Sequence, residues 1–180
     1  MAGAGDVTAA LATLGPSGWG VIANTVFNTP GLVGTSTNNA AASGMVGEMV
    51  WSTVDSGSPV SLASNTAANV TSISLTPGDW DIAAQVMHAL AGLTSVTQLN
   101  ASTSLTSATL SPQQGGGGLG AGATATQTYA ATTPAGAISQ EVANVRLSIA
   151  ATTIVYLVAK AIFSVSTAAA YGTIRARRAR

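Results

Sequence analysis

Few side chains in this sequence could perform chemistry, and the most suggestive of them is His88, the only histidine. In a serine hydrolase, a histidine base activates a serine that often sits in a Gly-x-Ser-x-Gly turn, and the sequence contains no such turn. His88 also falls on the apolar face of an alternating run, where a buried or interfacial histidine with a satisfied hydrogen bond is expected. We therefore predict no catalytic role for it. At an interface between subunits, it could make an assembly sensitive to pH.

Neither a metal site nor a phosphate site is indicated. Asp79 and Asp81 flank Trp80, so on a strand both carboxylates point away from the face of Trp80. Calcium takes about six to eight oxygen ligands, and a charged turn at the edge of a sheet explains two carboxylates better. The glycine-rich stretch 115–122 lacks the Lys-Ser/Thr pair of a Walker-type loop and is expected to be a surface loop. Cysteine is absent, which excludes thiolate ligands and disulfides. We predict no metal, no cofactor and no enzymatic activity.

The basic residues gather at the C-terminal end of the sequence. Alternation places the first two of them on one face of a terminal strand and the last two on the other. They could pair with acidic groups of a neighbouring subunit, such as Glu48 or Asp55, or with the surface of another protein. They could also form a solvated basic end that protects an edge strand. A nucleic-acid site would need a broader basic patch with aromatic residues, so no nucleic-acid partner is expected. The four residues are Arg175, Arg177, Arg178 and Arg180.

The composition favours a subunit of an assembly. Charged residues make up 7% of the 180 positions and their formal net charge is +0, whereas a typical domain has about 25% charged residues. A neutral surface gains little solubility from charge repulsion and tends to self-associate. The alternative is a small, low-charge domain of an ordinary soluble protein. The first residues lack the basic start and apolar core of a secretory signal, so assembly in the cytoplasm is expected.

One stretch, residues 149–171, is long enough to cross a membrane. It carries Lys160 near its middle, and a charge at that depth costs about 3 kcal/mol. Its residues also alternate as in a strand. We therefore expect no membrane partner.

Period-two alternation predicts an all-β protein, an antiparallel sandwich of about eight short strands without a long helix. The strand that includes Val155 to Val165 is apolar on one face and half apolar on the other. Such a strand needs cover from the opposite sheet and from a neighbouring subunit. The alternating runs are 48–54, 70–75, 80–90, a weaker run over 94–110, 124–129, 145–149, 155–165 and 171–180.

The first 45 residues differ from the rest, because glycine, proline, asparagine and serine divide them into turns and extended pieces. One short helix is possible over residues 6–15, with Asp6 as its N-cap and Gly15 just beyond its end. The segment either docks as an arm on another subunit or folds back on its own domain. Its apolar residues, which would form the docking contact, are Trp19, Val21, Ile22, Val26 and Phe27.

Five stretches of the sequence share motifs with a known family: 47–51, 73–82, 146–153, 155–159 and 171–177. They resemble structural proteins of tailed bacteriophages and their prophages, with a trimeric jelly roll of the tumour-necrosis-factor and complement globular-head kind. The resemblance covers about residues 46–180. In that fold a strand that ends in Pro-Gly leads into a Trp-x-Ile pattern, as it does here at Trp80 and Ile82.

The resemblance implies a homotrimer on a virion, with a jelly-roll domain over residues 46–180 and an anchoring arm over 1–45. We expect a capsid decoration or head-fibre protein that binds the major capsid protein through its arm. The alternative is a tail-tip or tail-fibre module that binds a receptor on the host surface. The predicted trimer interface consists of Tyr156, Val158, Ile162, Tyr171, Arg175 and Arg177.

Overall fold

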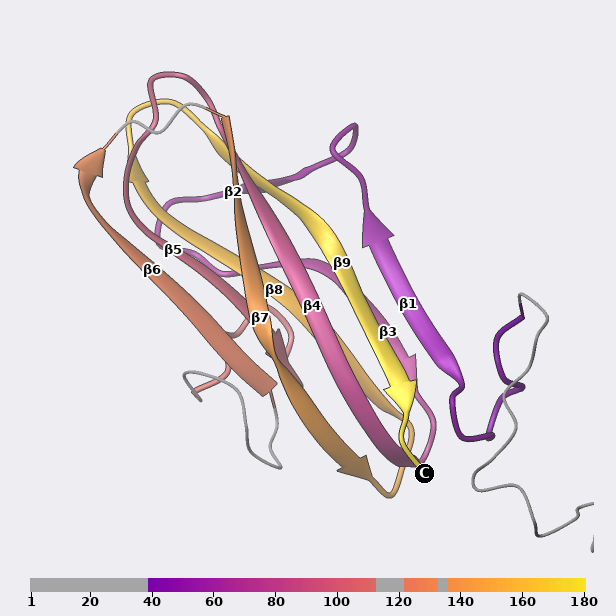
Figure 1. The fold of residues 1–180 in the computed structure, drawn as a ribbon. Coiled ribbons are helices and arrows are strands. Elements are labelled where there is room, and N and C mark those ends of the chain that lie inside the picture. The colour runs from indigo at the N-terminus through magenta and orange to yellow at the C-terminus, as the bar shows by residue number, and fades with distance from the viewer. Residues whose placement is uncertain (1–38, 113–121, 133–135) are drawn as a thin grey trace, which may run out of the picture. The chain divides into compact units, whose positions relative to one another are not determined.

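A computed structural model of the chain describes residues 39–112, 122–132 and 136–180. These residues form nine strands and no helix, so no membrane-spanning helix lies among them. The strands are β1 (Met49–Val54), β2 (Val60–Leu62), β3 (Ala68–Leu75), β4 (Gly78–Leu90), β5 (Ser95–Ser104), β6 (Gly122–Thr132), β7 (Gly136–Ile149), β8 (Thr153–Ser164) and β9 (Ala168–Arg178) (Figure 1).

The strands form two antiparallel sheets (Figure 1). Sheet A has the order β1-β9-β4-β7, and β2 pairs with the same strand β9 beyond the end of β1. Sheet B has the order β3-β8-β5-β6. Early strands thus pair with late ones in a nested series that ends in the neighbours β5 and β6, which is the arrangement of a jelly roll. The predicted antiparallel sandwich is confirmed.

The core lies between the sheets and is built from alternate residues of each strand. On β4 the inward row runs from Trp80 through Ile82 and Val86 to Leu90, as the sequence pattern predicted. Sheet B contributes residues such as Leu99 and Leu157 to the same core. Because one face of each sheet is covered by the other, the alternation of apolar and polar residues follows directly.

Several details differ from the sequence-based expectations. β7 begins at Gly136, well before the alternating run 145–149. The strand predicted over 94–110 ends at Ser104, because a polar turn follows in which the hydroxyl of Ser104 accepts a hydrogen bond from the amide of Thr106. The three-residue β2 was not predicted. The compact unit begins at Ala40, somewhat before the predicted boundary at 46. The expected helix over 6–15 and the glycine stretch 115–121 lie outside the described residues.

A substitution at Gly172 can test how closely the backbones of β9 and β4 approach each other. A Cβ atom at this position would lie 2.1 Å from the carbonyl oxygen of Gln85, so an added methyl group must displace a backbone. We expect Gly172→Ala to lower the free energy of unfolding by about 2 kcal/mol. Gly57→Ala is the control, because nothing lies within 4 Å of its added Cβ, and it should change stability by less than about 0.5 kcal/mol. Urea unfolding of both variants measures the difference, and equal stabilities would contradict the packing described here.

Candidate functional site

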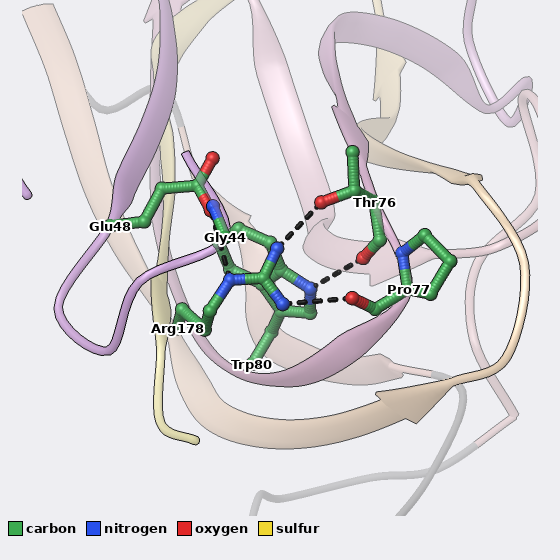
Figure 2. A network of polar contacts seen from close by, with 6 residues as sticks. All are labelled: Gly44, Glu48, Thr76, Pro77, Trp80 and Arg178. Carbon is green, nitrogen blue, oxygen red and sulfur yellow. Dashed lines mark hydrogen bonds and ion pairs between the residues drawn. The ribbon is translucent and has the colours of Figure 1, made fainter. Parts of the chain in front are cut away.

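The most strongly organised polar group is the guanidinium of Arg178, near the end of β9 (Figure 2). Its Nε donates to Glu48 Oε2 at 2.9 Å, its Nη1 to the Pro77 carbonyl at 2.8 Å and its Nη2 to Thr76 Oγ1 at 2.6 Å. The guanidinium also stacks 4.3 Å from the ring centre of Trp80. Arg178 is only 5% exposed. A buried charge is tolerated when it is paired and hydrogen-bonded in this way.

Glu48, the partner of Arg178, belongs to the turn that leads into β1. The backbone amide of Gly44 donates to Glu48 Oε2 at 2.8 Å (Figure 2). This hydrogen bond, and then the pairing with Arg178, lowers the pKa of the Glu48 carboxyl. The turn is also joined to β9 by a hydrogen bond from the Gly47 amide to the Arg178 carbonyl. The network therefore fixes the first residues of the compact unit to its C-terminal strand.

Two expectations for the C-terminal arginines are corrected by this network. Glu48 pairs within its own chain, so it is not available to a neighbouring subunit. Arg178 is buried, so it is not part of a solvated basic end. The predicted alternation holds, since Arg175 and Arg177 are exposed on the opposite face of β9.

Asp79 forms ion pairs with two arginines. It accepts hydrogen bonds from Arg146, and the Nε of Arg180 lies 2.7 Å from its Oδ2. The contact with Arg146 is the main cause that lowers the pKa of Asp79. Asp81 is exposed on the next outward position of β4. Among the described residues, no three His, Asp or Glu side chains gather as a metal site would require, and the contacts of Asp79 are those of a charged strand end.

His88 lies inside the sandwich and is 0% exposed. Its Nε2 is 3.0 Å from Gln140 Oε1, and Gln140 Nε2 donates to the Leu99 carbonyl at 3.1 Å. Because a carbonyl only accepts, Gln140 must present its oxygen to the ring, and His88 carries its proton on Nε2. Burial lowers the pKa of His88 to about 4. The expected buried histidine is confirmed, but it lies within one subunit and away from any outer face.

A second feature is the outward face of sheet A, which we call the sheet A face. Its side chains come from alternate positions of four strands, and Trp51 is 64% exposed among them. Cross-strand register places Trp51 beside Arg175 and Met49 beside Arg177. The face includes Met49 and Trp51 on β1, Tyr171, Thr173, Arg175 and Arg177 on β9, Asp81, Ala83 and Gln85 on β4, and Glu141, Asn144 and Arg146 on β7, where Arg146 is paired with Asp79.

The sheet A face is hollowed over Ala83. The register of β4 and β7 shifts between Ile82 and Ala84, so that Ala83 faces two residues of β7, Ala143 and Asn144. This extra residue is a β-bulge, which bends the strand and increases its twist. A hollow of about 540 Å³ lies there, and a neighbouring one of about 380 Å³ extends towards Glu141. The small side chain of Ala83 leaves this space open between the longer side chains around it.

The six predicted interface residues do not lie together. Tyr171, Arg175 and Arg177 belong to the sheet A face, whereas Tyr156, Val158 and Ile162 alternate along β8 on the outward face of sheet B. Since the two sheets pack face to face, one flat contact cannot include both groups.

Val158 is fully buried although it occupies an outward position of β8. Its neighbours across the sheet are Asn69 and Ser102. Both are hydrogen-bonded to the loop after β5, through the amides of Ala108 and Ser111, so this loop lies against the outward face of sheet B. Near this loop, the exposed apolar side chain of β8 is Ile154.

Trp51 and the hollow were not singled out by the sequence. The alternation of β1 did place Trp51 with Met49, but nothing indicated whether that side faced the core. The predicted arm residues Trp19, Val21, Ile22, Val26 and Phe27 lie outside the described residues.

Removing the Arg178 guanidinium tests the buried network. Arg178→Met keeps a long apolar side chain beside Trp80 but leaves the Glu48 carboxylate without its cation. We expect a loss of about 3 kcal/mol in the free energy of unfolding. Arg177→Met removes the same charge from the exposed neighbouring position and should change stability by less than about 0.5 kcal/mol. If chemical unfolding shows similar losses for both variants, the buried network does not contribute to the free energy of unfolding as expected here.

Buried His88 should make the fold less stable in acid. Its pKa is lowered in the folded state, so below pH 6.5 the unfolded chain binds a proton that the folded chain does not take up until about pH 4. Stability is therefore lost as the pH falls through this range, by about 2 kcal/mol between pH 8 and pH 5. His88→Gln should lack this loss. The midpoint of thermal unfolding, compared at the two pH values within each protein, cancels the baseline effect of the substitution. An equal pH dependence in both proteins would exclude the histidine as the cause.

Comparison with family models, with curated proteins and with solved structures finds no match to this chain.

Proposed function

We propose that the chain is a structural subunit of a bacteriophage virion: a homotrimeric capsid decoration or head-fibre protein. In this proposal it is assembled in the host cytoplasm and binds the major capsid protein through residues 1–45. The observation that carries the proposal is the nested strand pairing of a jelly roll, β1 with β9, β3 with β8, β4 with β7 and β5 with β6. This is the fold that the resemblance of the sequence implies.

The environments of the titratable groups support a structural role. The three groups with the clearest contacts are Glu48, Asp79 and His88, and each is held by partners that complete the fold. A catalytic acid or base needs access to a substrate as well as a shifted pKa. The shifted pKa values of these three groups are explained by structural contacts, and all three side chains are buried.

The arrangement of the two ends supports attachment through an arm. The turn at residues 44–48 and the end of β9 are fixed to each other by Arg178. They lie at the end of the sandwich where β4 begins, because the amide of Ala179 donates to the Asp79 carbonyl. The loops after β4 and β8 lie at the opposite end, joined by a hydrogen bond from the Ala91 amide to the Thr167 carbonyl. An anchored subunit would therefore present these loops away from the capsid.

A receptor-binding module of the tail is the second candidate. The observation that favours it is the exposed Trp51, which lies next to Arg175 in the lining of the hollow, since ligand sites combine aromatic side chains with a few polar groups. It ranks second because the same residues also suit a contact between subunits.

The location of the protein on the particle distinguishes the two candidates. The chain has no cysteine, so Gly92→Cys provides a single thiol for a gold label in the loop after β4. Nothing lies within 4 Å of a Cβ atom at this position, so folding should be unaffected. Electron microscopy of labelled particles should show gold distributed over the head, away from the arm end of each subunit. Gold confined to the tail tip would support the receptor-binding candidate, and particles without the label would contradict both.

A further inference from the structure

We infer that the sheet A face is the contact between copies of this chain, with the β1–β9 side of one copy against the β7 side of the next. The inference rests on the proposed homotrimer. In a ring of three, every contact is heterologous, so each subunit must offer two different surfaces that fit each other. The sheet A face provides two such surfaces on either side of β4.

The charges of the face are unevenly distributed. Arg175 and Arg177 are exposed on β9, and neither forms an ion pair within the described part of the chain. On the other side, Glu141 of β7 is exposed and is also without an ion pair among these residues. Asp81, in contrast, already lies between Arg177 and Arg146 in the register of the sheet. The cationic β9 side of one copy and the anionic Glu141 of another are therefore complementary.

Two large apolar side chains lie next to the arginines of β9 on the β1–β9 side of the face. Trp51 is 64% exposed next to Arg175, and Met49 lies next to Arg177. Tryptophan, methionine and arginine are the residue types that are enriched in protein interfaces, and buried aromatic and arginine side chains supply most of the binding energy.

The hollow over Ala83 provides a concave surface into which an exposed apolar side chain such as Trp51 of another copy could insert. Hot-spot residues typically insert into pockets on the partner. The larger hollow is bordered by Met49, Arg175 and Arg177 of the β1–β9 side itself. The smaller hollow of about 380 Å³ is lined by Glu141, Val142 and Asn144 of β7 together with residues of β4 and β9, so it reaches the side of the face that the β1–β9 side of another copy would approach. Trp51 of one copy against this hollow of the next would cover an exposed aromatic ring and a concave surface in one contact.

The outward face of sheet B is less suited to this contact. Val158 is covered by the loop after β5, and buried Ser102 and Thr124 are hydrogen-bonded to the same loop. Its exposed apolar side chain is Ile154, without an exposed aromatic of the kind found at position 51.

Charge exchange tests the contact in the full-length protein. Arg175→Glu places like charges across the contact, and so does Glu141→Arg. Each variant should weaken association by about tenfold or more. The combined variant Arg175→Glu/Glu141→Arg restores opposite charges and should associate nearly as the unsubstituted protein does. Sedimentation velocity over a range of concentrations measures the mass, which should be three times the 17.6 kDa of one chain before substitution.

Two controls separate association from folding. Lys160→Glu reverses a charge on the outward face of sheet B and should leave association unchanged. Circular dichroism and thermal unfolding should show that every variant keeps its fold, since Arg175 and Glu141 are exposed. Trp51→Ala should weaken association without any change of charge.

The outcomes distinguish this inference from the proposed function. If the full-length protein is trimeric and the exchange variants stay trimeric, the sheet A face is not the contact, but the proposed homotrimer is supported. If the protein is dimeric and responds to charge exchange as described, the inferred contact is supported and the proposed homotrimer is excluded. A monomer at all concentrations would exclude both the contact and the homotrimer. A monomer that binds an immobilised glycan array, and loses that binding in Trp51→Ala, would assign the face to a receptor.

Discussion

The C-terminal strand β9 is the constraint on which the rest of the structure depends. It lies between β1 and β4 and also pairs with β2, so β1 and β2 are joined to the rest of sheet A only through the last strand among the described residues. Arg178 secures the end of this strand by joining Glu48, the turn before β4 and Trp80. A buried guanidinium is unfavourable unless each of these contacts is made. The network therefore fixes the position of β9 more specifically than apolar packing alone would.

A second polar element crosses the core between the sheets. His88 of β4 is bonded to Gln140 of β7, which is bonded to the backbone of β5 at Leu99. The histidine must stay neutral, because the surrounding apolar residues provide no partner for a second proton. Like the arginine network, this arrangement specifies how the two sheets are placed against each other, and it does so at the opposite part of β4. Both elements use ionisable side chains to stabilise the fold.

The sheet A face depends on backbone geometry as much as on composition. The β-bulge and the small Ala83 produce its hollow, and the strand order brings Trp51 next to Arg175 although the two residues are far apart in sequence. The residues of this face without an ion pair among those described are Arg175 and Arg177 on β9 and Glu141 on β7, and the proposed contact between copies rests on these charges and on the exposed Trp51. The low overall charge favours the same contact, because few like charges oppose such association.

The sequence by itself determined the fold class and the inward residues of most strands. Alternation of period two is a local property, and it placed Trp80, Ile82 and Val86 in the core and separated Arg178 from Arg175 and Arg177 correctly. It could not decide which outward faces are covered, because that depends on strand order and on loops that are distant in sequence. Tertiary structure alone decided that Glu48 pairs with Arg178 in the same chain, that the loop after β5 covers Val158, and that the predicted interface residues lie on two opposite faces. These are contacts between segments separated by many residues, and their energies appear only when the two sheets bring the segments together.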